Sequence, residues 1–328
     1  MKKKLWLTVC CAVFIAALFL SGQIAAICRG ALRTCCETII PSLFPFFILS
    51  VLINRLGLPL YLGRRLSFCG RSLFGVSGAG VTALAMGLTG GYPMGAAYIA
   101  DMYRQKQITL RESEALLAFC NNSGPAFIIG AVGCGVFGSA RTGAILYAVH
   151  IMSAVSVGIL LKGKRKNFNF PTRTVEPALE RDIPFSLAFS DAVRTAVTSI
   201  FNVCGFVVCF TIIVRLLEES TLAVRLMQLC SAYSGLDISC IRVFFSGIFE
   251  LGCSLGEMGS LSPTPANLSL VSFILGWGGI SVHLQTHAVL SGTEIKGALH
   301  TAGRLLSGSI ASVYTYLLFS FIQMIGQL

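Results

Sequence analysis

The sequence predicts an all-α polytopic membrane protein made of two related repeats with interrupted or re-entrant helices. Three observations support this fold class. The 328 residues are 55% hydrophobic and only 12% charged, about half the charged fraction of soluble domains. Long apolar segments recur along the chain, and glycine, proline or amide side chains interrupt several of them. Two blocks of the first half also recur, in the same order, in the second half.

The charge and cysteine patterns narrow the class of protein further. The formal net charge of +11 comes from Lys and Arg in short segments between apolar runs, which is typical of cytoplasmic loops of membrane proteins. The sequence lacks a basic segment interleaved with aromatic residues, the pattern that would predict nucleic-acid binding. The expected partners are therefore the lipid bilayer and a small-molecule solute. The thirteen Cys residues show no CxxC spacing, and we interpret them as small buried residues rather than disulfides or metal ligands.

The first segment, residues 1–27, begins with three lysines and continues as an apolar run from Leu5 to Ile27. Small residues near Ala26 also fit a cleavable signal peptide. Because the run is long enough to cross a bilayer, we favour an uncleaved N-terminal transmembrane helix whose N-terminus is cytoplasmic.

The remaining apolar segments predict helices on both sides of a basic linker. In the first repeat, residues 28–161, apolar segments cover residues 41–53, 76–102, 126–137 and 142–161. The linker, residues 162–184, holds three prolines and six basic residues, four of them within residues 162–166, and we expect it to be cytoplasmic. In the second repeat, residues 185–328, we expect spans over residues 185–217, 240–255, 268–290 and 301–325.

Local signals fix one helix and constrain the topology. Thr109, with Glu112 three residues later, predicts a helix N-terminus, and that helix should end before residue 121. Basic residues occur in segments 55–71, 104–111 and 162–166, so all three should face the cytoplasm. This is possible only if some interrupted segments are re-entrant.

The chain resembles itself over two blocks. Residues 31–56 match residues 192–217 with five identities in 26 positions. Residues 115–153 match the second half at an offset of 154, which pairs Gly124 with Gly278 and Ser153 with Ser307. The two blocks indicate a duplication, although shared Gly and Ala can also reflect membrane composition. Duplicated units are typical of secondary transporters, which bind solutes where broken helices of the two halves meet.

The first predicted substrate-binding segment is Asn121-Asn122-Ser123-Gly124-Pro125. Peptide groups freed by this break need partners, because the bilayer offers none. The two amide side chains offer donors and acceptors to a small polar solute, and the amides that begin the next helix favour an anionic group. The alternative is an ordinary loop at the membrane surface.

Two further interruptions complete the predicted site, one at residues 90–95 and one at residues 276–285. A lone histidine is more often structural than a ligand, so both roles stay open for His283. The substrate-binding residues that we predict in these two segments are Gly91, Tyr92, Pro93, Gly278, Gly279, His283 and Gln285.

Glu250 is the candidate coupling-ion or proton site, because a carboxylate inside an apolar run usually faces a cavity or a cation. The alternative is a buried ion pair with Arg194, Arg242 or Arg304. No HExxH or Walker pattern occurs in the sequence, and the GxSxG match at residues 252–256 lies at the end of a predicted membrane span. We therefore expect no enzyme activity, no catalytic or metal site and no cofactor.

Four motifs resemble the YlbJ-type sporulation integral membrane proteins, and the likeness spans about residues 28 to 325. They are Pro-Ser-Leu-Phe-Pro-Phe-Phe at 41–47, Gly-Gly-Tyr-Pro-Met-Gly at 90–95, Leu-Ala-Phe-Cys-Asn-Asn-Ser-Gly-Pro at 117–125 and Gly-Gly-Ile-Ser-Val-His-Leu-Gln at 278–285.

The resemblance implies paired nucleoside-recognition (Gate) domains with distant kinship to concentrative nucleoside transporters. It also implies transport of dipicolinic acid across the outer forespore membrane during sporulation. The alternatives are transport of a nucleoside or another small polar solute, and a non-transporting structural or assembly protein of the spore envelope. Unbroken, evenly packed helices would favour a structural protein, whereas interrupted helices with polar residues favour transport.

Overall fold

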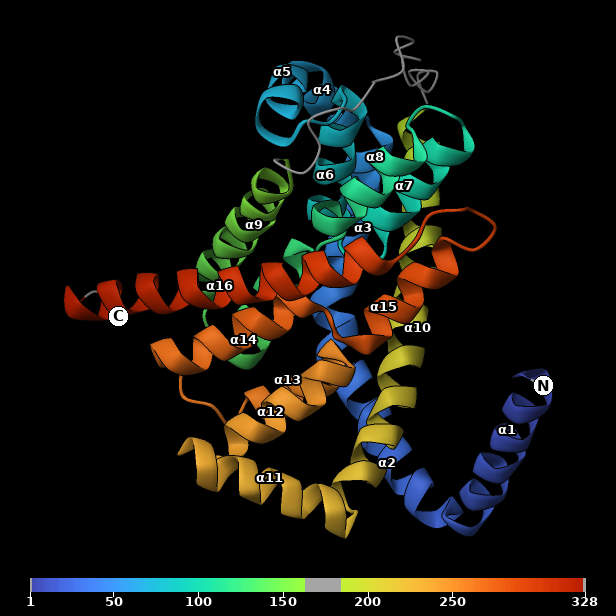
Figure 1. Ribbon diagram of the computed structural model, residues 1–328, viewed down its shortest axis with the longest axis vertical. Coiled ribbons are helices and arrows are strands. Elements are labelled where there is room, and N and C mark those ends of the chain that lie inside the picture. The colour runs from blue at the N-terminus through green and yellow to red at the C-terminus, as the bar shows by residue number, and fades with distance from the viewer. Residues whose placement is uncertain (1, 163–183, 327–328) are drawn as a thin grey trace.

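The computed structural model describes residues 2–162 and 184–326, which fold entirely into helices and their connections (Figure 1). Five helical segments are long and apolar enough to cross a membrane: Ser21–Arg55, Ala140–Lys162, Phe185–Glu218, Pro265–Val289 and Ala298–Met324. The predicted all-α membrane fold is therefore confirmed. Most of the expected linker at 162–184 lies outside the described residues.

The first half contains α-helices and three wider π-helical segments, labelled η, in which each turn takes up more residues. In chain order they are α1 (Lys2–Phe19), α2 (Ser21–Thr34), η1 (Cys35–Ile39), α3 (Ile40–Arg55), α4 (Leu58–Arg65), α5 (Ser67–Cys69), η2 (Gly70–Phe74), α6 (Gly78–Gly90), α7 (Met94–Arg104), α8 (Leu110–Cys120), η3 (Ala126–Val136) and α9 (Ala140–Lys162).

The second half contains α-helices alone among its described residues. They are α10 (Phe185–Glu218), α11 (Thr221–Ser234), α12 (Ile238–Phe249), α13 (Leu251–Met258), α14 (Pro265–Trp277), α15 (Gly279–Val289) and α16 (Ala298–Met324).

The two halves present their elements in the same order. Each has a long helix, a peripheral helical segment, two helices broken in the middle and a final long helix. Ser153 and Ser307, which the offset of 154 pairs, lie 3.0 Å apart between their hydroxyl oxygens. If a rotation axis relates two copies of a unit, equivalent residues that lie on the axis contact each other in this way. The duplication stays a prediction that accounts for both observations.

Several predicted segments differ in detail from the observed helices. The apolar run over residues 5–27 is divided at Leu20, and the chain from Ser21 to Arg55 forms one long helical segment that includes η1. The expected span over residues 240–255 is two helices separated at Glu250. Helix α11 was not predicted; it begins at the N-cap Ser220, whose hydroxyl accepts from the Ala223 N–H.

The predicted helix start at Thr109 is confirmed, because its hydroxyl accepts from the Glu112 N–H at 3.2 Å. Glu112 is itself buried and accepts from the Ser77 N–H at 2.7 Å. A side chain in the first turn of α8, Glu112, therefore also fixes the entry into α6.

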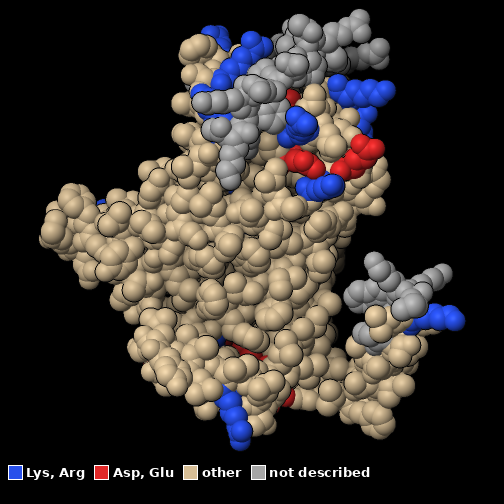
Figure 2. All heavy atoms as spheres, in the orientation of Figure 1, with Lys and Arg blue, Asp and Glu red and all other residues tan. Residues whose placement is uncertain are grey.

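Basic segments gather at one end of the molecule. Figure 1 places α4, α5 and the connection between α7 and α8 together at the top, and Lys162 Nζ donates to the Ser72 carbonyl nearby. They share this end because α6 and α7 fold back on each other at Gly91, with Gly87 packed on Gly95. Figure 2 shows a broad uncharged belt below this charged end, as expected of a lipid-facing surface.

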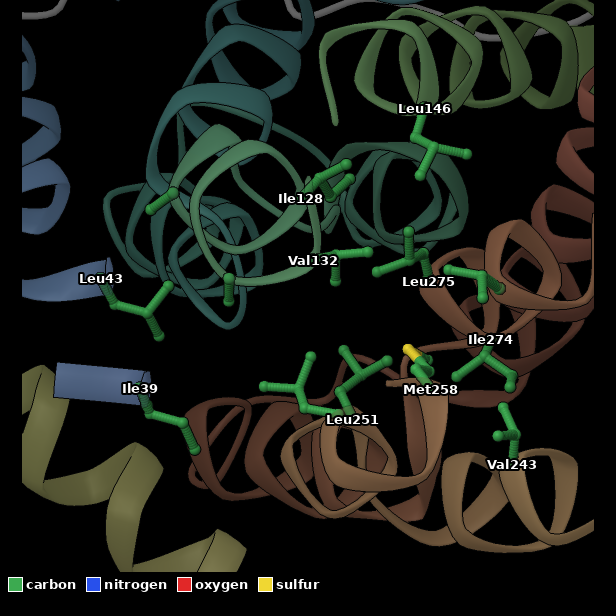
Figure 3. Packing of buried hydrophobic residues seen from close by; sticks show 14 of the residues in the cluster. Ile39, Leu43, Ile128, Val132, Leu146, Val243, Leu251, Met258, Ile274 and Leu275 are labelled. Atoms are coloured by element: carbon green, nitrogen blue, oxygen red, sulfur yellow. The ribbon is translucent and has the colours of Figure 1, made fainter. Parts of the chain in front are cut away.

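The core joins the two halves. Figure 3 shows Ile39, Leu43 and Ile128 of the first half packed towards Leu251 and Ile274 of the second. Helix α14 also packs directly on α16, where a Cβ atom added to Gly276 would lie 2.4 Å from the Gly308 Cα. Small residues permit this close approach, which supplies packing contacts where the hydrophobic effect between helices is weak.

Candidate functional site

Helix breaks from both halves meet in the middle of the molecule, where a Cβ atom added to Gly278 would lie 3.2 Å from the Tyr92 hydroxyl oxygen. Gly91 has a left-handed φ of +76°, and a Cβ atom added to it would lie 3.0 Å from the Gly124 nitrogen. A Cβ atom added to Gly279, where φ is +82°, would lie 3.0 Å from the Glu250 Cα. Glycine is required for these conformations and for such contacts between backbones. Segments that are far apart in the sequence are therefore adjacent in space.

An outer cavity of about 400 Å³ lies beside the breaks, between α3, the α6–α7 turn, α10 and α15. Its wall is mostly apolar and carries a few polar groups, a composition and size typical of small-molecule sites. The polar side chains on this wall are Ser50, Tyr92, Ser199, Asn202 and Gln285.

A smaller inner cavity of about 60 Å³ adjoins the outer one, and Tyr92 and Gln285 line both. Ser123 and Gly124, at the entry to η3, form part of the inner wall, and Glu250 forms another part. This volume holds a few water molecules or one polar end of a larger solute.

Glu250 is the N-cap of α13 and is only 5% exposed. Its Oε2 accepts from the Cys253 N–H at 2.8 Å, and the Ser281 hydroxyl donates to its Oε1 at 3.4 Å. These donors are neutral. Within residues 2–162 and 184–326 no Lys or Arg forms an ion pair with Glu250, so the alternative of a buried pair with Arg194, Arg242 or Arg304 is not observed. A carboxylate so placed can take up a proton or a cation from the cavity.

Asn121 connects the helix break at residues 121–125 to three other helices, α7, α15 and α16. It is fully buried, and its Oδ1 accepts from the Ala96 N–H at 3.4 Å. Its Nδ2 donates to the Thr286 hydroxyl at 2.9 Å and lies 3.0 Å from His300 Nε2. The Nδ1 atoms of His300 and His283 lie 3.2 Å apart. The Asn121 amide is therefore committed to the protein and does not line either cavity.

Asn122 is also fully buried and holds a buried cation. Its Oδ1 accepts from Arg304 Nη1 at 2.9 Å, and its Nδ2 donates to the Phe119 carbonyl at 2.8 Å. Arg304 Nη2 donates to the Ala118 carbonyl at 3.1 Å, and Nη1 lies 3.4 Å from the Tyr92 hydroxyl. The guanidinium thus occupies the C-terminal, partially negative end of α8.

Ser123, next along the break, donates its backbone N–H to His150 Nε2 at 3.1 Å. His150 belongs to α9 and is buried. A histidine ring therefore satisfies a peptide group that the helix break leaves unpaired, as a membrane interior requires.

The predicted site residues fall into two sets. One set lines the cavities: Gly91, Tyr92, Pro93, Ser123, Gly124, Gln285 and Glu250. The other set lies behind the walls and shapes them: Asn121, Asn122, Pro125, Gly278, Gly279 and His283, whose ring packs on Trp277 with centroids 4.4 Å apart.

Sequence reasoning missed the contribution of α10 to the outer cavity. Ser199 and Asn202 line it from that helix. The available signal was Asn202 itself, an amide inside an otherwise apolar run. Ser199 gave no comparable signal, because serine satisfies its hydroxyl within a membrane helix at little cost.

The class of protein follows from the fold. The chain is similar to a solved structure of CNTnw, a concentrative nucleoside transporter, in an outward-facing state, with a TM-score of 0.63. The likeness covers 96% of this chain and 86% of that chain at 14% sequence identity. The protein is a multi-pass membrane protein with the fold of a concentrative nucleoside transporter.

The family follows from the sequence comparison. The chain is 32% identical, over 313 residues, to the sporulation integral membrane protein YlbJ of Bacillus subtilis (strain 168), covering 86% of this chain and 74% of that protein. No family model matches the chain. The chain belongs to the YlbJ family, as its motifs predict.

Proposed function

We propose that this protein transports a small anionic solute through the paired cavities, and that the solute is dipicolinic acid moving into the forespore across the outer forespore membrane. The observation that carries the proposal is the position of the cavities, which lie where broken helices of both halves meet. Secondary transporters hold their substrates at such junctions.

Size and wall chemistry support a compact aromatic dicarboxylate. The outer cavity, at about 400 Å³, has apolar walls for a ring and amide groups from Asn202 and Gln285 for its polar edge. The inner cavity receives one carboxylate next to Ser123 and Gly124, at the N-terminus of η3, where backbone amides and the helix dipole favour an anion. Asn121 and Asn122 act indirectly, by holding the break in place.

Glu250 couples the solute to a cation in this proposal. A cargo carboxylate about 5 Å from an ionised Glu250 is repelled by about 3 kcal/mol at an effective dielectric constant of about 20. An anion therefore enters the inner cavity readily only when Glu250 has taken up a proton or a cation. Anion and cation then move together, and the cation gradient drives accumulation.

The test is uptake of labelled dipicolinate into proteoliposomes. Replacing Gln285→Leu removes a polar group from both cavities, and we expect uptake at limiting solute to fall about tenfold or more, since one hydrogen bond to a charged group is lost. Gln323→Leu makes the same change on the exposed surface near the end of α16 and should leave uptake unchanged. Equal uptake by both variants would remove Gln285 from the site, and no uptake by the wild-type protein would overturn the proposed function.

The two alternatives give different results in the same system. A nucleoside transporter would take up labelled uridine in preference to dipicolinate; the fold likeness alone does not choose between these cargoes. A structural protein of the spore envelope would take up neither. In sporulating cells that lack the protein, we expect dipicolinate to accumulate in the mother cell and to be missing from spores, and spores with normal dipicolinate would contradict the proposal.

A further inference from the structure

Arg304 carries a positive charge at the centre of the protein, and the groups that bond to it are neutral. Its side chain is 0% exposed, and its acceptors are the neutral oxygens of Asn122, Ala118 and Tyr92. Its Nε is buried and has no hydrogen-bond partner. In the described parts of the chain no Asp or Glu forms an ion pair with Arg304.

Such a charge is expensive to keep. Removing an ion from water costs far more than neutral hydrogen bonds return, and the usual remedy is a buried carboxylate partner. The C-terminal end of α8 offsets part of the cost through its partial negative charge. The histidines nearest in these networks, His150, His283 and His300, offer no negative charge. An anion placed near Arg304 would therefore interact favourably with its uncompensated charge.

A single residue, Tyr92, lies between Arg304 and both cavities. Tyr92 lines both of them, and its hydroxyl lies 3.4 Å from Arg304 Nη1. Ser123 and Gly124, which follow directly on Asn122, line the inner cavity. A charge behind a low-dielectric wall acts across it with little screening. The inner cavity is thus positive on the side of Arg304 and the η3 N-terminus, and it faces Glu250 on another side.

We propose that Arg304 determines the charge of the cargo: its guanidinium, acting through Tyr92, makes the inner cavity accept a carboxylate in preference to a neutral polar group of the same shape. Arg304 is a specificity-determining residue that does not itself line the cavity. The inference rests on the proposed function, because it concerns the same cavity.

The competing explanation is that Arg304 is only a structural cap for α8. A cap stabilises the protein and affects the binding of charged and neutral solutes alike. A specificity residue changes the ratio of the affinity for the charged solute to the affinity for the neutral one. The ratio of two affinities measured on one sample is also independent of how much of the protein is folded.

The experiment compares two probes of nearly identical shape, dipicolinate and its neutral analogue pyridine-2,6-dicarboxamide. Dissociation constants are measured by isothermal titration calorimetry on the full-length protein in detergent, for the wild type and for Arg304→Lys, Arg304→Gln and Asn122→Asp. Asn122→Asp leaves the guanidinium in place and puts a carboxylate at the position now 2.9 Å from Nη1. It therefore supplies the missing counter-charge even if Arg304→Gln does not fold.

We expect the wild-type protein to prefer the dianion and Arg304→Lys to keep that preference within about threefold. Arg304→Gln and Asn122→Asp should each reduce the ratio of dipicolinate affinity to diamide affinity about 30-fold or more. This is the change expected when a buried charge partner is lost. A folded Asn122→Asp protein with the wild-type ratio would overturn the inference and leave the proposed function intact. A wild-type protein that binds neither probe would overturn the proposed function, and a wild-type preference for the diamide would overturn the inference alone.

Discussion

Gly303 in α16 packs against Ala118 in α8, just before the helix break at residues 121–125. A Cβ atom added to Gly303 would lie 2.1 Å from the Ala118 carbonyl oxygen and 2.6 Å from the Ala118 Cα. Real Cβ atoms do not approach closer than 3.0 Å, so the two helices would have to separate by almost an ångström. The same carbonyl accepts the hydrogen bond from Arg304 Nη2. Gly303→Ala should therefore disturb both the packing and the buried cation.

The expected cost has three parts. Forced overpacking of this kind costs about 1–3 kcal/mol, and loss of a hydrogen bond to a charged group costs about 1.5–3 kcal/mol. Alanine in place of glycine returns about 1 kcal/mol of helix propensity. We therefore expect Gly303→Ala to lower the free energy of unfolding by about 1.5–5 kcal/mol, or the apparent Tm by about 3 °C or more.

The assay is thermal unfolding of the purified protein in detergent. Gly205→Ala in α10 and Gly256→Ala in α13 are matched controls, because a Cβ atom added at either position meets nothing within 4 Å. Both controls should melt at the wild-type temperature or slightly above it. If Gly303→Ala melts with the controls, the reasoning from the contact with Ala118 is wrong.

Three other predictions concern the N-cap of α8, the coupling site and the cavity wall. Thr109→Ala should lower the free energy of unfolding by about 1 kcal/mol, measured by thermal unfolding beside Thr109→Ser, which keeps the cap; equal melting of the two would refute it. Glu250→Gln should keep exchange of dipicolinate across proteoliposomes but abolish accumulation against a gradient, and retained accumulation would exclude Glu250 as the coupling site. Asn202→Cys should react with a water-soluble maleimide beyond the wild-type level and be protected by dipicolinate, whereas Asn121→Cys, at a fully buried position, should not react.

Features that depend on local sequence were predictable. The N-cap at Thr109, the breaks at residues 90–95 and 121–125, and the long apolar helices Ala140–Lys162, Phe185–Glu218 and Ala298–Met324 appear at the expected places. Each depends on neighbouring residues alone: a capping side chain, a continuous apolar run, or glycine and proline that cannot continue a helix. The family resemblance is confirmed by the 32% identity to YlbJ, and two of its four motifs contain these breaks.

Features that depend on tertiary contacts were not predictable. Asn121 and Asn122 were predicted to bind substrate, yet their partners, Thr286 and Arg304, come from the other half of the chain. For Glu250 the sequence left open an ion pair with an arginine, yet no basic residue among its described neighbours pairs with it. Composition shows which polar groups need partners in the membrane, but only the packing of the two halves decides whether a protein group or a solute supplies them.

The chain of hydrogen bonds from Asn121 through the two histidines has a fixed direction. Because Asn121 Oδ1 accepts from Ala96, its amide nitrogen donates, and His300 Nε2 must accept. The proton of His300 then lies on Nδ1 and is donated to His283 Nδ1, so the proton of His283 lies on Nε2, which is buried without a partner. Every basic nitrogen of the pair is occupied. An added proton must therefore break a hydrogen bond of α16, either to α15 or to the helix break at residues 121–125, so acidification would loosen the packing of α16.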